Sequence, residues 1–531
     1  MSAHRLIPLA ATLLIATAHV VPAATTPERP NIVFIFTDDH AVQATSSYGS
    51  TLVETPNIDR LARGGMRFDK AYVANSICGP ARATILTGTH SHRNKFYLNN
   101  LAPFDGSQQT FPKILQNAGY QTAIIGKWHL ESDPTGFDHW EVLSDLGGQG
   151  QYYDANFATP DGETPSNGYV STVVTDKAIE WLATERDPSR PFLLMYQHKA
   201  PHRGFTPGPD EIEVWDDEAK VPEPPTLFDC FANRASVRSE ARMRISDHLL
   251  RGDVKYHDER YENDPQLGPL WKKAFGPGND AFDAAPPTGT DRTRWLYQRY
   301  IKSYLATVTS TDREIGRLLD ALDEMGLTEN TLIVYTSDQG FFLGEHGWFD
   351  KRWIDEESAR IPLLVQWPGV VEPGSVNDDL VQNLDFAQTL LEAAGADADP
   401  RMQGQSFLPQ LRGEQPESWR TGLYYHYYEF PGFHGVAKHY GVITKRYKLV
   451  HYYEAGEWEL FDLELDPDEL VSRYDDPTYA EVRKDLETQL TALRRQYEVP
   501  DVDEAPNWWQ ARLGDAADRA LVWWRGFPQE P

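Results

Sequence analysis

The sequence predicts a doubly wound α/β fold, in which helices cover a sheet of buried parallel strands. Helical patterns separate several short apolar runs, and this alternation indicates an α/β sheet. The 531 residues suffice for a large core and more than one domain. The runs that predict buried strands are NIVFIFTDDH (31–40), QTAIIGKWHL (121–130), PFLLMYQHKAPH (191–202), NTLIVYTSDQG (330–340) and IPLLVQWPG (361–369).

The elements between and after these strands suggest the domain organisation. Helical periodicity appears in PNIDRLARGG, VVTDKAIEWLATE and STDREIGRLLDALDEMG, the last stopped by Gly326. A stretch rich in Pro and charge at about 205–295 predicts a long irregular insertion over or beside the sheet. Aromatic-rich strands such as GLYYHYY and a late helix, ETQLTALRRQYEV, predict a smaller α+β domain. We therefore expect a catalytic domain over 28–414 and a C-terminal subdomain over 415–531.

Charge and the N-terminal sequence limit the classes of function. A formal net charge of −29 argues against nucleic-acid binding and against anionic membrane surfaces, although not against an anionic substrate. His4 and Arg5 precede an apolar run that ends in small residues, which predicts a signal peptide over 1–24 cleaved near Ala23 or Ala24. Other segments are too short or too polar to form a transmembrane span. We expect an exported protein, periplasmic or secreted.

Ionisable side chains gather where the predicted strands end. The carboxyl ends of strands in open α/β sheets are where ligands bind. Adjacent carboxylates repel each other unless a cation lies between them, and oxygen ligands suit Ca²⁺ or Mg²⁺ rather than zinc. A capping or turn pair is the alternative for the first two carboxylates taken alone. The strand-end residues are Asp38, Asp39, Lys127, His129, His198, Lys199, His202, Asp338 and Gln339.

The segment SICGPARATILTG (76–88) places Cys78 at the predicted start of a helix that Gly88 stops. Pro80 suits the first helical turn, and a helix N-terminus favours an anion. Arg82 would lie one turn further on the same side. The pattern indicates a site for a negatively charged group. A disulfide to Cys230 is the alternative, which its irregular polar surroundings disfavour.

From this segment onward the chain resembles the type I sulfatases. CGPARATILTG is similar to their signature C-x-P-[SA]-R followed by a helix and T-G, and the stretches GKWHL, KAPH and SDQGFFLGEHGWFDKR occur in the family's order. The resemblance covers nearly the whole mature chain. It implies an alkaline-phosphatase-like sulfatase fold, with a large mixed sheet flanked by helices and a smaller C-terminal α+β domain. It also implies hydrolysis of sulfate esters.

The resemblance implies that Cys78 is a precursor. In such enzymes a formylglycine-generating or equivalent modifying enzyme oxidises this cysteine to formylglycine, whose hydrate is a geminal diol. One diol oxygen attacks sulfur and displaces the alcohol, and the other then loses its proton as the aldehyde re-forms and sulfate leaves. The resemblance also implies a calcium ion, with Mg²⁺ as an alternative. Its ligands would be Asp38, Asp39, modified Cys78, Asp338 and Gln339.

The remaining roles also come from the resemblance. Arg82 and Lys127 would stabilise the diol oxygens and the negative transition state. His129 would be the base for the diol proton, and His202 would protonate the leaving oxygen with help from Lys351, which also contacts sulfate. Each could instead be structural or a surface charge, and Arg352 rivals Lys351. The chain departs from the family where Ala81 replaces the commoner serine and Gln339 the usual Asn or His.

The substrate is predicted less sharply. Stretches such as SDPTGFDHWEVL and HYYEFPGFHGVAKHYG resemble bacterial N-acetylglucosamine-6-sulfatases or mucin-desulfating sulfatases, whose relatives act on algal polysaccharides such as ulvan or carrageenan. We expect a sulfated saccharide substrate, with His198, His434 and His439 as candidate contacts; most tyrosines of the small domain are expected in its core. The alternatives are a phosphonate or phosphate ester hydrolase of the same superfamily and a noncatalytic sulfated-glycan-binding protein.

Overall fold

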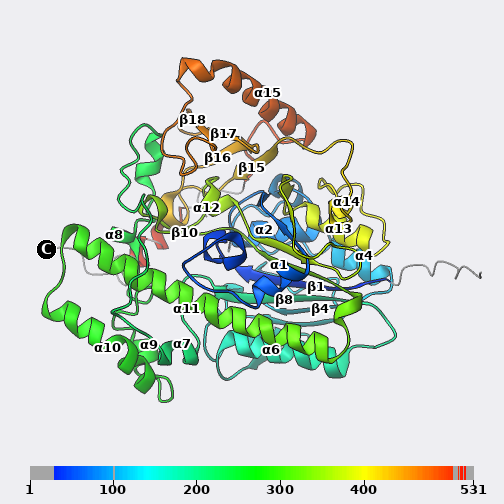
Figure 1. Ribbon diagram of the computed structural model, residues 1–531, viewed down its shortest axis with the longest axis horizontal. Helices are drawn as coiled ribbons and strands as arrows, with labels where there is room; N and C mark the ends of the chain where they lie inside the picture. Colours follow the sequence, from blue (N-terminus) through cyan, green and yellow to red (C-terminus); the bar gives the residue numbers. More distant parts are fainter. Residues whose placement is uncertain (1–28, 100–101, 506–511, 514, 518, 522–531) are drawn as a thin grey trace, which may run out of the picture.

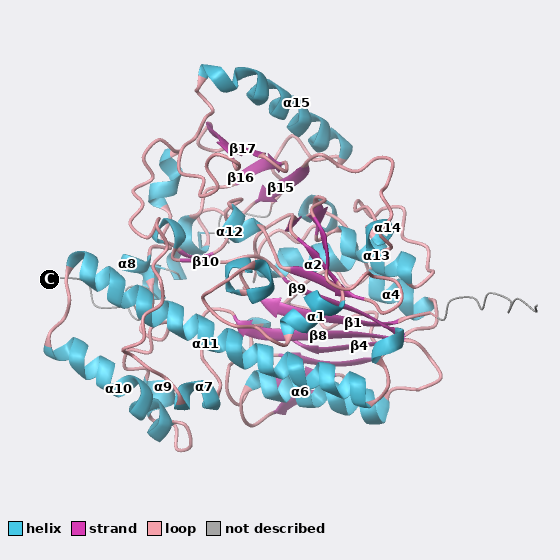
Figure 2. Cartoon of the chain, in the orientation of Figure 1, coloured by secondary structure: helices cyan, strands magenta, loops and turns pink. Residues whose placement is uncertain are grey.

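A ten-stranded mixed sheet forms the centre of the larger domain (Figures 1 and 2). The structure, a computed structural model, describes residues 29–99, 102–505, 512–513, 515–517 and 519–521, so the predicted signal peptide lies outside the described residues. The strand order is β13 (Ser375–Asn377), β2 (Met66–Phe68), β12 (Leu363–Gln366), β9 (Thr331–Ser337), β1 (Asn31–Asp38), β8 (Phe192–Pro201), β4 (Gln121–Gly126), β5 (His139–Leu143), β6 (Asn156–Thr159) and β7 (Gly162–Pro165).

Helices cover both faces of this sheet. Alternate residues of β1 point into two separate cores: Ile32 and Phe34 pack in one, and Val33 and Ile35 in the other. One face carries α2 (Cys78–Thr87), α4 (Phe111–Asn117) and α13 (Asp385–Ala393). The other carries α6 (Val170–Glu180) and α11 (Gly289–Glu324), which run side by side in Figure 1. The doubly wound arrangement is confirmed, and it explains why these strands are apolar throughout.

One strand differs from the prediction in direction. All five apolar runs are buried strands, but β12 pairs antiparallel with β9. A continuous apolar run encodes burial and not direction. The chain between the two strands holds the hairpin of β10 (Phe342–Leu343) and β11 (Phe349–Asp350) and only the short α12 (Glu356–Ala359). It therefore lacks the long crossover helix that usually joins two neighbouring parallel strands.

The insertion is more helical than the sequence predicts. It contains α7 (Pro209–Glu213), α8 (Ile245–His248), α9 (Glu259–Glu262) and the longer α10 (Gly268–Ala284). Helix α11 begins at Gly289 rather than near Ser310, with Leu296, Tyr300 and Tyr304 buried at four-residue spacing. Hydroxyls such as Thr307 bond to carbonyls four residues back, which satisfies Ser and Thr inside the helix.

The C-terminal part forms a second layer above the sheet in Figure 1. Four antiparallel strands, β15 (Leu423–Tyr427), β16 (His439–Ile443), β17 (Tyr447–Tyr452) and β18 (Glu457–Asp462), pack against α15 (Ala480–Gln496). This agrees with the predicted smaller α+β unit. The remaining elements are α1 (Ile58–Gly64), α3 (Ser91–Asn94), α5 (Asp145–Gly148), α14 (Leu408–Leu411), β3 (Ala71–Tyr72) and β14 (Val381–Gln382).

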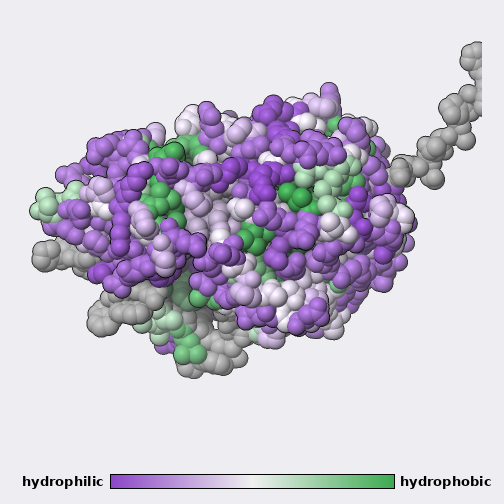
Figure 3. Space-filling model, turned by 90° about the horizontal axis from the view of Figure 1, so that it is seen from below, coloured by the Kyte–Doolittle hydropathy of each residue, from purple (hydrophilic) through white to green (hydrophobic). Residues whose placement is uncertain are grey.

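The surface agrees with the acidic composition. The face in Figure 3 is mostly hydrophilic, with small scattered apolar patches. Among the described helices none is both long and apolar enough to cross a membrane. The two cysteines are not paired, because Cys78 is buried while Cys230 is exposed. The disulfide alternative is therefore wrong.

Candidate active site

Parallel pairing brings the predicted carboxylates together. In the register of β1 and β9, Thr37 lies opposite Ser337, so Asp38 and Asp338 leave the sheet side by side. The amide of Asp39 donates to Asp338 Oδ1 at 3.1 Å, in a residue whose φ of +67° turns the chain. Strand β8 lies next to β1 and β4 next to β8, so Lys127 and His202 emerge at the same edge.

Helix α2 brings Cys78 to this edge from above the sheet. The helix begins at Cys78 and ends at Gly88, whose φ of +62° supports a left-handed cap, as the sequence predicts. Cys78 is 1% exposed, and its Sγ lies 3.5 Å from Gln339 Nε2. Burial raises the pKa of the Cys78 thiol to about 12, against the opposing effect of Lys351. The unmodified thiol is thus protonated at neutral pH and a weak nucleophile.

Three buried cations surround these groups. Arg82 donates to Asp338 Oδ2 at 3.0 Å, to the Lys127 carbonyl at 2.8 Å and to Gln197 Oε1 at 2.9 Å. Lys127 pairs with Asp38, and Lys351 Nζ lies 2.7 Å from Asp39 Oδ2. The three cations balance the three carboxylates, so a bound divalent cation would leave the edge positive and attractive to a sulfate group despite the acidic protein.

The oxygen ligands fit a hard cation. Ligand oxygens of Asp38, Asp39 and Asp338 lie within 4.8 Å of one another. Asp38 Oδ1 and Gln339 Oε1 are sealed from solvent and have no hydrogen-bond partner among the described residues. Burial, with the neighbouring carboxylates adding to it, raises the pKa of Asp39 to about 6 and of Asp338 to about 8. A bound divalent cation would relieve this repulsion, so the residues fit a hard divalent metal ion.

The two predicted acid–base histidines both lie near this cluster. His202 Nε2 is 3.8 Å from Asp39 Oδ2, and His129 Nε2 is 2.9 Å from Gln149 Nε2. Burial lowers the pKa of both rings well below the usual value for histidine. His129 is therefore neutral, as a base must be. A bound sulfate beside His202 would favour its protonated form.

The three histidines predicted to contact the substrate have different surroundings in the structure. His434 Nε2 lies 3.2 Å from Asp350 Oδ2, next to Lys351. His198 is fully buried with its ring 4.4 Å from that of Tyr196, and its ring nitrogens have no hydrogen-bond partner among the described residues. His439 is also fully buried, stacked on Trp353, with Nδ1 bonded to a backbone carbonyl at 2.7 Å. Both rings are buried, and a role for His198 and His439 in substrate binding stays a prediction.

Sequence reasoning missed several residues of the site. Gln149 contacts both Lys127 and His129, Gln197 fixes Arg82, and Asp350 bonds to Arg352 and His434. A glutamine in a loop or in the middle of a strand belongs to no sequence motif that would predict a functional role. Asp350 had a signal, since it directly precedes Lys351 in GWFDKR.

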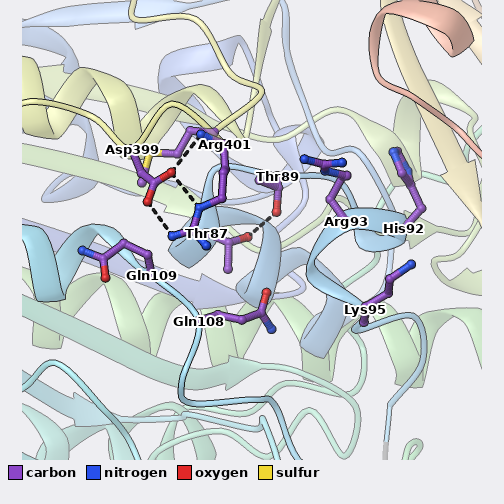
Figure 4. Close-up of a pocket in the computed structure, with 10 residues that line it drawn as sticks. Thr87, Thr89, His92, Arg93, Lys95, Gln108, Gln109, Asp399 and Arg401 are labelled. Carbon is purple, nitrogen blue, oxygen red and sulfur yellow. Dashed lines mark hydrogen bonds and ion pairs between the residues drawn. The ribbon is translucent and has the colours of Figure 1, made fainter.

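A cavity at the other end of α2 is not the reaction site. It has a volume of about 220 Å³, and none of the predicted site residues lines it (Figure 4). Its cations are already paired: Arg93 with Glu498 at 2.7 Å, Lys95 with Glu504 at 2.7 Å and Arg401 with Asp399 at 2.6 Å. Among the described residues that line it there is no cysteine and no buried side-chain oxygen without a hydrogen-bond partner, in contrast to the strand ends.

Comparison with known proteins agrees with this geometry. Residues 30–396 match the family model described as sulfatase, and residues 344–496 match the model of the N-sulphoglucosamine sulphohydrolase C-terminal region. The chain belongs to the sulfatase family and is a sulfuric ester hydrolase. The alkaline-phosphatase-like sulfatase fold is likewise confirmed.

Individual sulfatases and solved structures are similar to this chain over most of its length. The chain is 43% identical over 518 residues to the N-acetylglucosamine-6-O-sulfatase of Bacteroides thetaiotaomicron, covering 94% of this chain and 92% of that protein. A solved structure in complex with its substrate D-glucosamine-2-N,6-O-disulfate matches with a TM-score of 0.87 and 43% identity, over 90% of this chain and 100% of that one. The phosphonate monoester hydrolase of Agrobacterium radiobacter, at 21% identity, shares the fold with a TM-score of 0.65, over 88% and 96% of the two chains.

Proposed function

We propose that this sulfatase hydrolyses the 6-O-sulfate ester of glucosamine residues, N-acetylated or N-sulfated, in glycans or their fragments. The observation that carries the proposal is the 43% identity over nearly the full length to an N-acetylglucosamine-6-O-sulfatase. The cluster around Cys78 supports the chemistry, because it gathers a candidate nucleophile, three cations and two histidines at one strand edge.

We infer that residue 78 acts as formylglycine, made from Cys78 by a modifying enzyme. When present, the hydrated aldehyde supplies the attacking oxygen and a second hydroxyl that allows sulfate to leave. The protonated thiol of Cys78 supports the need for modification. Arg82 is held rigidly by Asp338 and Gln197, so its guanidinium is preorganised toward the charge that develops beside residue 78.

The two histidines divide the proton transfers. His129, neutral in its buried position, accepts the proton from residue 78 as sulfate departs. His202 donates a proton to the leaving sugar oxygen, in the protonated form that a bound sulfate favours. Lys351, fixed by Asp39, contacts the sulfate and assists His202.

A divalent cation, which we propose to be Ca²⁺, would be held by Asp38, Asp39, Asp338 and Gln339, with residue 78 as a further ligand. When bound, it draws charge from sulfate oxygens and favours ionisation at residue 78. The unpartnered oxygens of Asp38 and Gln339 support this assignment. Gln339 offers an amide oxygen where an Asn is more usual.

We propose that Asp350, Arg352 and His434 bind the sugar ring. Burial opposes the ionisation of Asp350, but Arg352, Lys351 and His434 hold its pKa well below the usual range. Asp350 is thus a fixed, charged acceptor next to a sulfate-binding lysine. Such acceptors suit sugar hydroxyls, which donate hydrogen bonds.

Sulfate release from a panel of monosulfated sugars tests the proposal. The panel contains N-acetylglucosamine-6-sulfate, N-acetylglucosamine-3-sulfate, N-acetylgalactosamine-6-sulfate and D-glucosamine-2-N,6-O-disulfate, with inorganic sulfate measured by ion chromatography. We expect the highest kcat/KM on the two 6-sulfated glucosamines. A preference for the 3-sulfate or for the galactosamine epimer would contradict the assignment.

The fold shared with the phosphonate monoester hydrolase makes phosphoryl transfer a second activity to test. Matched aryl sulfate, phosphate and phosphonate esters with one leaving group would separate the two. We expect sulfate to be the fastest. Binding of sulfated sugar without release of sulfate would instead favour a noncatalytic glycan-binding protein.

A further inference from the structure

The side chain of Gln149 lies between two residues with proposed chemical roles. Its Oε1 accepts a hydrogen bond from Lys127 Nζ at 2.6 Å, and its Nε2 lies 2.9 Å from His129 Nε2. Lys127 also pairs with Asp38, so two of its three N–H groups are committed. The direction of the third N–H group is therefore restricted. This restriction determines where Lys127 can donate a hydrogen bond to a substrate oxygen.

The polarity of the amide fixes the state of His129. Turning the amide around would place its NH₂ group against the ammonium of Lys127, so Oε1 must face the lysine. Nε2 of Gln149 is therefore a donor, and His129 Nε2 must accept. A ring that accepts at Nε2 is neutral, with its proton on Nδ1. The one lone pair of this neutral ring is at Nε2, so His129 takes up a proton there as the amide of Gln149 gives up its hydrogen bond.

The loop that presents Gln149 has an unusual backbone. Leu146, Gly147, Gly148 and Gly150 all have positive φ, from +53° to +83°. A Cβ on Gly148 would lie 3.3 Å from the backbone Cα of His129, so a residue with a side chain would crowd the base.

The loop is also anchored and strained. Asp145 accepts hydrogen bonds from the backbone and side chain of Asn156 at 2.6 and 2.8 Å. Leu146 has a positive φ although it is not glycine, and its side chain is 71% exposed, so core packing does not account for this strained backbone. Strain of this kind persists where a structure holds a functional group in place.

We propose that Gln149 is a positioning residue, which orients Lys127 and holds the resting His129 ring neutral, with its lone pair at Nε2 released from the amide when the proton arrives. The inference rests on the proposed function, because it assigns Gln149 a part in the proton transfer from residue 78. Nothing in the composition of the loop marks this glutamine, and only the two hydrogen bonds reveal it.

Charges around His129 explain why a neutral amide is needed. The charged groups that face the ring are Lys127, Asp38, Arg82 and Lys351, of which three are cations that favour the neutral ring. A glutamate at position 149 would still bond to Lys127. It would also place a carboxylate against His129 and favour the imidazolium, which cannot accept a proton.

The test compares Gln149→Met and Gln149→Glu with the matched control Gln151→Met, whose side chain is exposed. For Gln149→Met we expect kcat on N-acetylglucosamine-6-sulfate to fall about 10- to 100-fold. Binding of the same sugar in a Cys78→Ala background, measured by calorimetry, should weaken less than fivefold, because Lys127 keeps Asp38. For Gln149→Glu we expect the acid limb of the pH–rate profile to shift upward by at least about one pH unit. The control should match wild type.

Three results would overturn the inference: kcat within twofold of wild type in both variants, binding that weakens as much as kcat falls, or an unshifted acid limb in Gln149→Glu. An aryl sulfate is assayed in parallel. Wild-type turnover of the aryl sulfate but not of the sugar would refute the proposed sugar substrate, and the variants would still decide the role of Gln149. Thermal melting of each variant shows that losses do not come from unfolding.

Discussion

Among single residues, Cys78 is the one on which the proposed mechanism of sulfate release depends. Replacing it by alanine should lower sulfate release by about four orders of magnitude or more, because the attacking group is lost. The fold should be retained, since a buried Cys is a small side chain and Ala is also helix-favouring. Activity measured by ion chromatography, with circular dichroism as a control, checks this. Sulfate release above a hundredth of the wild-type rate would exclude residue 78 as the nucleophile.

The assignment of His202 as the general acid can be tested by changing the leaving group of the substrate. His202→Ala should lower kcat about 10²- to 10⁴-fold on a sugar sulfate, whose alkoxide leaves poorly. The loss should be much smaller on an aryl sulfate with an acidic phenol, which leaves without a proton. Equal losses on both substrates would show that His202 does not protonate the leaving oxygen.

Residue types that the chemistry requires could be predicted from the sequence. Cys78, Arg82, Asp38 and Asp338 belong to a recognisable signature or follow apolar strands, and the structure brings them together. Gln149 and Gln197 could not be predicted, because glutamine has many roles and their contacts come from loops and strands distant in sequence. The sequence could not show which face of β8 His198 occupies, and its contact with the substrate stays a prediction.

At the scale of elements, strand burial could be predicted but strand direction and helix length could not. Hydrophobic runs located β1, β4, β8, β9 and β12, yet the run at β12 gave no sign that it is antiparallel. The first half of α11 was missed because its Thr, Ser and Tyr residues have low helical propensity. Tertiary burial outweighs that propensity.

A buried ion network joins the insertion to the C-terminal sheet. Arg238, which is fully buried, contacts Asp355 at 2.7 Å and Glu459 of β18 at 2.8 Å. Arg238→Leu leaves two buried carboxylates without their cation and should destabilise the fold by about 3–5 kcal/mol. Chemical denaturation measures this.

The matched control for this network is Arg401→Leu, which removes the exposed partner of the half-buried Asp399 and should change stability by less than about 1 kcal/mol. A wild-type denaturation midpoint for Arg238→Leu would mean that the network does not hold these elements together.

At the scale of the whole molecule, the metal should couple activity to stability. Removing it with a strong chelator should lower sulfate release at least tenfold and lower Tm, because a ligand that binds only the native state stabilises it. Added Ca²⁺ should restore both. Full activity after chelation, with no metal found by elemental analysis, would contradict the proposed ligand set of Asp38, Asp39, Asp338 and Gln339.

The proposed mechanism requires that residue 78 of this sulfatase is modified. The decisive experiment is the mass spectrum of the tryptic peptide AYVANSICGPAR, residues 71–82, from active protein made in its native host. We predict that residue 78 carries an aldehyde in place of its thiol. An intact thiol throughout a preparation that releases sulfate would contradict it.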